Sequence, residues 1–156
     1  MKKEVYEQYA ALNKQEKKTN ELYHRIAMRL GISDSVFWTL YNLYETAEAL
    51  TQNDIAGNMG FPKQTIHSAI RSLVKDGYVY LSQKAVARNS KTVHLSDKGR
   101  AFCKKYIQPV MNTEEAAADR LTEEEFRYYL SIGEKLNLCL QQELTMFLEA
   151  MGGETK

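Results

Sequence analysis

The chain has 156 residues, of which 44% are hydrophobic and 26% are charged, and its formal net charge is only +1. This composition is that of a soluble globular protein of about one domain, and no stretch has the ~20 apolar residues that a membrane-spanning helix needs. The first residues also lack the apolar core of a signal peptide, so we expect a cytoplasmic protein with no membrane partner.

Stop residues, caps and apolar spacing in the first half of the chain predict four helices. A helix is expected over residues 5–30, because Gly31 is a natural stop, and a second helix begins at Ser33 or Asp34, either of which can cap it. The pattern Thr51-x-x-Asp54 resembles a capping box and starts a third helix. Gly60 then permits a turn into a fourth helix, which ends at Gly77. The buried stripe of this fourth helix is expected to consist of Ile66, Ala69, Ile70, Leu73 and Val74.

The second half begins with a predicted β-hairpin. Residues 78–81 (YVYL) and 91–95 (KTVHL) read as its strands, and the polar residues 82–90 as its loop. A helix from Ser96 or Asp97 to about residue 118 and a last helix over about 122–151 follow, the latter with a Thr122/Glu125 capping box. The predicted fold class is mainly α with a small β-hairpin wing: a winged helix-turn-helix domain flanked by N- and C-terminal dimerisation helices.

We expect a single domain over residues 1–156, with a DNA-binding lobe at 33–97 and dimerisation helices at 1–32 and 98–156. The last predicted helix, over about residues 122–151, spans ~45 Å, whereas a compact chain of this size is ~40 Å across. Its apolar side therefore outruns the body that should cover it, and a second copy is the simplest cover. The expected dimer residues are Tyr9, Leu12, Leu136, Leu140, Leu144, Phe147 and Leu148.

Charge is unevenly distributed along this nearly neutral chain. Residues 61–105 contain ten Lys/Arg and two Asp/Glu, a net of +8, whereas the remaining residues contain eleven basic and eighteen acidic side chains, a net of −7. Local charge determines the field that a phosphate backbone meets. The basic segment therefore favours nucleic acid as the partner, although a solvated basic face with no partner would give the same count.

The basic segment coincides with the predicted helix-turn-helix and wing. The second helix of such a pair enters the major groove, and the side opposite its apolar stripe carries short or flexible polar groups and cations. The candidate residues of this recognition helix are Lys63, Gln64, Thr65, His67, Ser68, Arg71 and Lys75. The candidate residues of the wing, which would reach a minor groove or phosphates, are Lys84, Arg88, Asn89, Ser90 and Lys91.

These patterns resemble the MarR family of bacterial transcription regulators. The resemblance covers nearly the whole chain and is most specific in LTQNDIAGNMGFPKQTIHSAIRSLVKDGYV and in NSKTVHLSDKGRAF, where the family's Leu-Thr-x-x-Gly wing exit occurs as Leu95-Ser96-Asp97-Lys98-Gly99. The resemblance implies a homodimeric regulator, most often a repressor, that binds double-stranded DNA at a palindromic operator and is often released by a small ligand.

One departure from the family pattern falls on the wing. The family wing commonly carries Asp-x-Arg, but the corresponding positions here are Ala87 and Asn89, with Arg88 between them. We expect Arg88 to take over the groove contact from a shifted loop. Weaker readout by the wing is the alternative.

Aromatic residues on the first two helices suggest a ligand cleft, which the resemblance would place beneath the DNA-binding lobe. Tyr23, Trp38, Tyr41 and Tyr44 could hold a small aromatic or phenolic effector, although core packing is the ordinary role of such residues. Two further functions stay open: a winged helix that binds another protein, and a ligand sensor whose DNA contact is vestigial.

Other kinds of site are not indicated. No Cys/His cluster has metal-ligand spacing and no nucleotide or hydrolase motif is present, so we expect no metal, no cofactor and no enzymatic activity. Cys103 and Cys139 read as free thiols that are buried or half-buried. A redox role for Cys103 stays open, since Lys104 and Lys105 could stabilise a thiolate if they face it.

Overall fold

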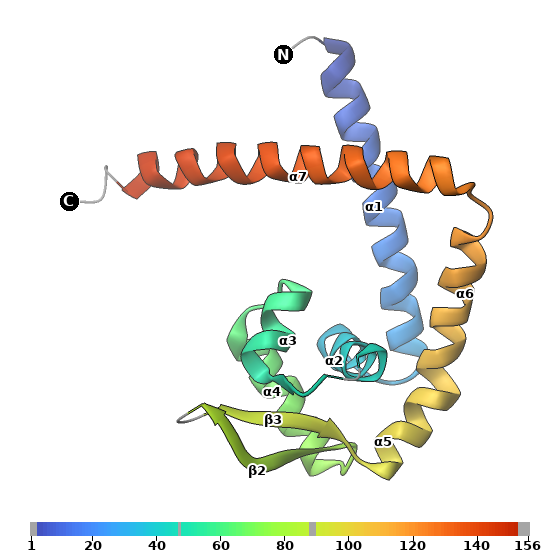
Figure 1. The fold of residues 1–156 in the computed structure, drawn as a ribbon, viewed down its shortest axis with the longest axis vertical. Coiled ribbons are helices and arrows are strands. Elements are labelled where there is room, and N and C mark those ends of the chain that lie inside the picture. Colours follow the sequence, from blue (N-terminus) through green and yellow to red (C-terminus); the bar gives the residue numbers. More distant parts are fainter. Residues whose placement is uncertain (1–2, 47, 88–89, 153–156) are drawn as a thin grey trace. The chain divides into compact units, whose positions relative to one another are not determined.

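The computed structural model describes residues 3–46, 48–87 and 90–152, and their side chains except those of residues 83–90 (Figure 1). The chain divides into two compact units, residues 1–109 and 110–156. Helices dominate both units, and a small antiparallel sheet lies in the first, as the sequence predicted. Within the described residues, none of the helices is both long enough and apolar enough to cross a bilayer.

The first unit contains the helix-turn-helix and the wing. Its elements are α1 (Lys3–Arg29), α2 (Asp34–Glu45), β1 (Leu50–Thr51), α3 (Gln52–Met59), α4 (Lys63–Lys75), β2 (Val79–Ala87), β3 (Ser90–Leu95), α5 (Asp97–Phe102) and the π-helical turn η1 (Cys103–Ile107). The predicted caps are confirmed: Ser33 caps α2, and Thr51 and Asp54 form a capping box at α3.

The sheet has the order β1-β3-β2, with all neighbours antiparallel. Strand β1 was not predicted; its two residues pair with β3, where Leu50 lies opposite Val93. The prediction of a long loop over residues 82–90 was wrong, because β2 continues to Ala87 and β3 begins at Ser90. Hydrogen bonds between strands use the backbone, so polar side chains that suggested a loop do not prevent pairing.

The core of the first unit lies between α2, the helix pair and the sheet. Phe37 and Leu40 of α2 are buried together with Ile55 of α3 and with Ile66 and Ile70 of α4. The prediction that Val74 belongs to this stripe was wrong, since Val74 is 41% exposed. One residue past the buried Leu73 is about 100° further around the helix, which turns Val74 away from the core.

A polar brace joins the end of α4 to the start of α5. The Ser96 hydroxyl accepts a bond from the Gly99 backbone N–H at 3.0 Å and contacts the Gly77 carbonyl oxygen at 2.6 Å. Lys98 donates to the Asp76 carbonyl oxygen at 2.7 Å, and its ammonium lies 4.4 Å from the centre of the Tyr78 ring. These contacts fix where α4 ends relative to α5, the helix that follows β3.

The predicted helix over 97–118 is interrupted by η1. At its first residue, Cys103 is fully buried, with Sγ 3.9 Å from the Leu40 carbonyl oxygen, and burial raises the pKa of its thiol to about 12. Lys104 and Lys105 are exposed. The suggestion that they stabilise a Cys103 thiolate is therefore wrong, and Cys139, which is exposed, also departs from the expected burial.

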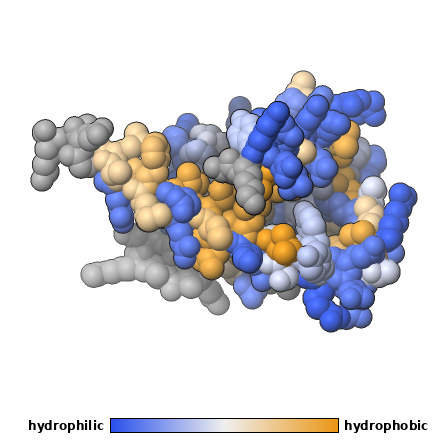
Figure 2. All heavy atoms as spheres, turned by 90° about the horizontal axis from the view of Figure 1, so that it is seen from above, coloured by the Kyte–Doolittle hydropathy of each residue, from blue (hydrophilic) through white to orange (hydrophobic). Residues whose placement is uncertain are grey.

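The second unit consists of α6 (Gln108–Ala118), which starts at the end of the first unit, and α7 (Glu123–Gly152). The predicted capping box of α7 is confirmed, since the Thr122 backbone N–H donates to Glu125 Oε2 at 2.8 Å. No residue of α7 is buried. Figure 2 shows hydrophobic side chains gathered along this helix towards its C-terminal end.

Candidate nucleic-acid interface

A tight turn positions α4 against α3. The Asp54 carboxylate accepts bonds from the Thr51 backbone and hydroxyl at 2.8 and 2.7 Å, and these bonds lower the pKa of Asp54. At the other end of α3, Gly60 has φ of +64°, a conformation that favours glycine. Ile55 of α3 and Ile66 of α4 are both fully buried, whereas the other side of α4 is exposed, so α4 is held by one side only.

The opposite side of α4 is open to solvent. Lys63, Gln64, His67, Ser68, Arg71 and Lys75 are exposed, whereas Thr65 is half-buried. Positions 63, 67, 71 and 75 are four residues apart and therefore follow one another along a single helix face. The structure thus brings the predicted recognition residues onto one surface, with Thr65 at its margin.

Two hydrogen bonds organise polar groups on this surface. The Ser68 hydroxyl donates to the Gln64 carbonyl oxygen at 3.0 Å, so it can still accept a bond from outside. His67 Nδ1 lies 3.1 Å from Oε1 of Gln52, the first residue of α3. Gln52 was not among the predicted residues; its place in the first turn of the helix that precedes α4 was the available signal.

Within the described part of the chain, the cations of α4 have no carboxylate partner. Among the residues that the structure describes, the ion pairs are Lys3–Glu7, His24–Asp34 and Arg127–Glu123, none of which involves α4. Lys63, Arg71 and Lys75 therefore present their charges to solvent. An exposed cationic face of this kind attracts phosphate, and the polar groups between the cations could reach base edges in a groove.

The wing residues are only partly described. Lys91 of β3 is exposed, beside the buried Thr92 and Val93. The backbones of Lys84 and Ser90 belong to β2 and β3, but their side chains are not described, and Arg88 and Asn89 lie outside the described residues.

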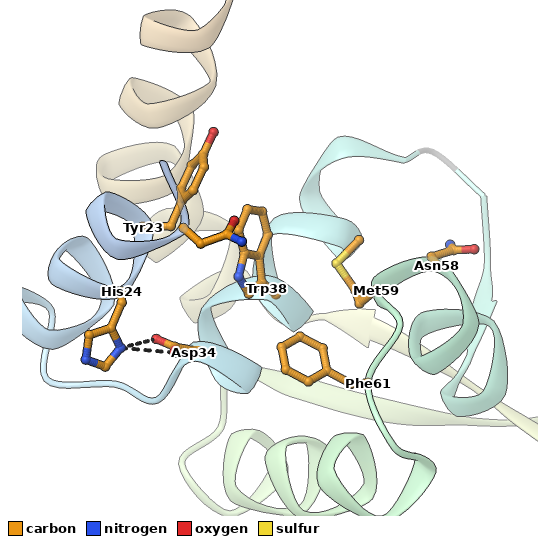
Figure 3. A pocket seen from close by; sticks show the side chains of 8 residues that line it. Tyr23, His24, Asp34, Trp38, Asn58, Met59 and Phe61 are labelled. Atoms are coloured by element: carbon orange, nitrogen blue, oxygen red, sulfur yellow. Dashed lines mark hydrogen bonds and ion pairs between the residues drawn. The ribbon is translucent and has the colours of Figure 1, made fainter. Parts of the chain in front are cut away.

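A pocket of about 410 Å³ lies between α1, α2 and the turn of the helix pair (Figure 3). Tyr23 and Trp38 line it, as two of the four aromatic residues proposed for a ligand cleft. Sequence reasoning missed the remaining lining residues, which are Asn20, His24, Asp34, Asn58, Met59 and Phe61.

Polar contacts fix two parts of the pocket wall. His24 Nδ1 lies 3.0 Å from both carboxylate oxygens of Asp34, a pair drawn with dashed lines in Figure 3. Asn58 donates to Asn42 Oδ1 at 3.3 Å and so ties the end of α3 to α2. Because Met59 and Phe61 flank Gly60, the pocket borders the turn that sets the direction of α4.

The other two proposed cleft residues lie elsewhere. Tyr41 packs against Trp38, with ring centres 5.3 Å apart, in an aromatic cluster that also includes Tyr23 and Phe37. Tyr44 lines a different pocket of about 390 Å³, together with Arg100 and Lys104. The structure therefore separates Tyr44 from Tyr23 and Trp38.

A comparison with models of protein families finds a match, which covers the region that contains the helix pair. The model of the MarR family matches residues 30–88, which include α2, β1, α3, α4 and all of β2. Among curated proteins, a search finds no match to this chain.

Several solved structures share the fold. The MarR family regulator NMB1585 from Neisseria meningitidis has a TM-score of 0.76 at 15% identity, over 88% of this chain and 96% of its own. MarR of Staphylococcus aureus, solved with salicylate and kanamycin, has a TM-score of 0.68 at 12% identity, over 91% and 95%. MepR of S. aureus, solved in a DNA complex, has a TM-score of 0.59 at 21% identity, over 92% and 97%.

Proposed function

We propose that this protein, whose residues 30–88 match the model of the MarR family, is a transcription regulator that binds double-stranded DNA in a sequence-specific manner. The observation that carries the proposal is the exposed face of α4. Its cations lack ion-pair partners among the described residues, and the opposite face is buried in the core. MepR, which has the same fold, has been solved with DNA.

The α4 surface has the chemistry that a major groove requires. That groove admits one α-helix and offers hydrogen-bonding edges between two rows of phosphates. Gln64, His67 and Ser68 lie in the N-terminal half of α4, where base contacts are expected, and Arg71 and Lys75 lie further along, where phosphates are the expected partners. In the wing, Lys84, Arg88, Asn89, Ser90 and Lys91 are proposed to contact a minor groove or phosphates.

We further propose that the functional unit is a homodimer. In a single chain, Leu144, Phe147 and Leu148 are 58%, 59% and 66% exposed, and no residue of α7 is buried. Apolar surface of this extent on one helix marks an interaction site. A second copy of the chain covers it in a self-complementary interface that includes Tyr9, Leu12, Leu136 and Leu140.

Oligomeric state tests the dimer directly. Sedimentation of the purified chain should give about 36 kDa, twice the mass of 18.0 kDa for one copy. Replacing Phe147 and Leu148 together by aspartate should give monomers or unfolded protein. Replacing the exposed Glu149 and Glu143 by glutamine, as a control, should leave the dimer intact. A wild-type monomer at micromolar concentration contradicts the proposal.

A dimer with two α4 helices implies an operator with two-fold symmetry. Half-sites about one helical turn of DNA apart would then be read by the two copies. Repression is the proposed outcome, through occupation of a promoter by the cytoplasmic protein. The sign of regulation is tested by placing the selected operator before a reporter gene and measuring expression with and without the protein.

The decisive experiment selects bound fragments from random DNA at two salt concentrations. We expect a palindromic motif and an affinity that falls steeply with salt, because phosphate contacts release counterions. A winged helix that binds a protein through apolar contacts would select no motif and would show little dependence on salt. A ligand sensor with vestigial DNA contact would bind DNA weakly and with no preferred sequence.

A small aromatic effector is a second proposed partner, favoured by the pocket beside Gly60. Tyr23, Trp38 and Phe61 supply aromatic surface, and the His24–Asp34 pair supplies polar groups. A compound bound there would contact both α2 and the turn before α4, and so could alter the direction of the recognition helix. The MarR of S. aureus that shares this fold was solved with salicylate.

Trp38 makes effector binding measurable without a label, because it is the only tryptophan of the chain. Titration with small phenols and aryl carboxylates should quench or shift its fluorescence to saturation. Met59→Lys, which places a charged chain in the pocket, should abolish the saturable change. Saturable quenching that survives this substitution would place the compound elsewhere.

A further inference from the structure

A hydrogen bond between side chains links the two helices of the helix-turn-helix on the proposed DNA-binding surface. Gln52 is the first residue of α3 and is half-buried, and its Oε1 lies 3.1 Å from Nδ1 of the exposed His67 on α4. The two residues are fifteen positions apart, so the bond depends on the packing of the helices. Neither residue is used by the core.

This bond determines which nitrogen of His67 carries the proton. An amide oxygen only accepts hydrogen bonds, so Nδ1 must be the donor. In a neutral imidazole the other nitrogen is then an acceptor. Among the described residues, Nε2 of His67 has no hydrogen-bond partner. The pair thus presents one acceptor with a defined orientation on an exposed helix face.

We propose, resting on the DNA-binding function above, that Gln52 is a positioning residue and that His67 is a specificity-determining residue that selects adenine or cytosine. In the major groove these two bases present an exocyclic amine, N6–H₂ of adenine or N4–H₂ of cytosine, which donates to an acceptor. Guanine and thymine present only acceptors at the corresponding edges, and these would face the lone pair of Nε2 without a proton between them.

The role of Gln52 follows from the same chemistry. Without its oxygen, nothing on α3 holds the proton on Nδ1, and His67 can place a donor or an acceptor towards the groove. An imidazole with both tautomers populated can form a hydrogen bond with any of the four bases. Gln52 therefore contributes selectivity at one position of each half-site without adding affinity through a phosphate contact.

The first test measures the tautomer in the free protein and does not require DNA. Long-range ¹H–¹⁵N correlation spectra at pH 8 should show His67 protonated on Nδ1, with the signal assigned by its loss in His67→Ala. Gln52→Met keeps the length of the side chain but removes the acceptor, and should give the averaged shifts of a mixture. Asn53→Leu, at the neighbouring exposed residue, is the control and should leave His67 unchanged. A wild-type His67 protonated on Nε2 overturns the proposal.

The second test selects bound fragments from random DNA at pH 8 with the same four proteins. Wild type and Asn53→Leu should prefer adenine or cytosine by about fivefold at one position of each half-site. His67→Ala and Gln52→Met should both lose this preference at that position and keep the rest of the motif. The inference is overturned if Gln52→Met keeps the preference, or if the responding position selects guanine or thymine. If wild type selects no motif at all, the proposed function fails instead, whatever the tautomer spectra show.

Discussion

The α-carbon of Gly99 faces the carbonyl oxygen of Tyr78 so closely that a Cβ atom on Gly99 would overlap it. Leu95 Cδ2 would also lie 3.2 Å from that Cβ. The wing exit Leu95-Ser96-Asp97-Lys98-Gly99 therefore needs glycine at its last position for space, since the φ of this residue is not left-handed. The close approach lets α5 begin directly beside the end of α4.

Gly99→Ala is predicted to destabilise the protein. Because the overlapping atom belongs to the backbone, α5 or the start of β2 must shift, at a cost of about 1–3 kcal/mol in the free energy of unfolding. Gly57→Ala in α3 is the matched control, since a Cβ there meets nothing within 4 Å and alanine favours a helix. Urea denaturation should show a lower free energy of unfolding for Gly99→Ala and no decrease for Gly57→Ala. Equal stability of the two variants would contradict the close approach.

Ser96→Ala tests the polar brace. The substitution removes the cap of α5 and the contacts of the hydroxyl with the Gly77 and Tyr78 carbonyl oxygens. We expect a loss of about 1–2 kcal/mol in unfolding free energy, the upper range for a helix cap. Ser72→Ala, which removes only a long 3.4 Å contact with Asp76 on an exposed face, should change stability little. Unchanged stability of Ser96→Ala would contradict a contribution from the brace.

The capping box of α3 predicts a dependence of stability on pH. The Thr51 hydroxyl and backbone N–H bind the Asp54 carboxylate and lower its pKa, so the stabilisation is present above the pKa of the unfolded chain, near 4. It is lost as pH falls through the lower pKa of the folded state, because the native form must then take up a proton. The difference in stability between wild type and Asp54→Asn should thus be full at pH 7 and shrink below pH 4. A difference that is constant over this range would contradict the charge-based cap.

Cys103 is predicted to be inert in the folded protein. Its thiol is fully buried and burial raises its pKa to about 12, so the reactive thiolate is strongly disfavoured at pH 8. In Cys139→Ser, a thiol reagent should titrate no group under native conditions and one group in guanidinium chloride. Rapid native labelling of this variant would show that Cys103 is reachable and would reopen a redox role.

Two substitutions on α4 should affect DNA binding differently. Arg71→Ala removes a cation expected at phosphate, so affinity should fall for all sequences and the salt slope should fall by about one unit. Gln64→Ala should keep the slope but relax preference at one base position, by about fivefold or more. Arg88→Ala on the wing should behave like Arg71→Ala if it meets phosphate. Unchanged binding in all three variants would mean that the assigned surface is wrong.

Local rules predicted most of the fold because the signals lie close together in the sequence. Thr51 with Asp54, Ser96 at its helix start and the buried stripe of α4 each depend on residues within one or two turns. The extent of β2 was missed because Ser82, Gln83 and Lys84 suggested a loop, whereas strand pairing uses backbone groups whatever the side chain. Strand β1 was missed because two residues give no periodicity.

The candidate site was predictable as a surface but not as a set of contacts. The spacing of Lys63, His67 and Arg71 already placed them on one helix face. The bond from Gln52 to His67 depends on how α3 crosses α4, and the pocket depends on how α1 approaches the turn. Such distances between elements far apart in the chain cannot be read from periodicity.

Lys98 lies in the basic segment, yet its ammonium donates to the Asp76 carbonyl and rests on the Tyr78 ring. Its charge is therefore engaged within the protomer, at the end of α4 where backbone carbonyl groups concentrate partial negative charge. A formal count of Lys and Arg thus overstates the electrostatic attraction that this segment can exert on a polyanion. Chemical neutralisation of Lys98, for instance by acetylation, would therefore act first on the junction between α4 and α5, which it would loosen. Any change in the attraction of a polyanion would follow from that loosening.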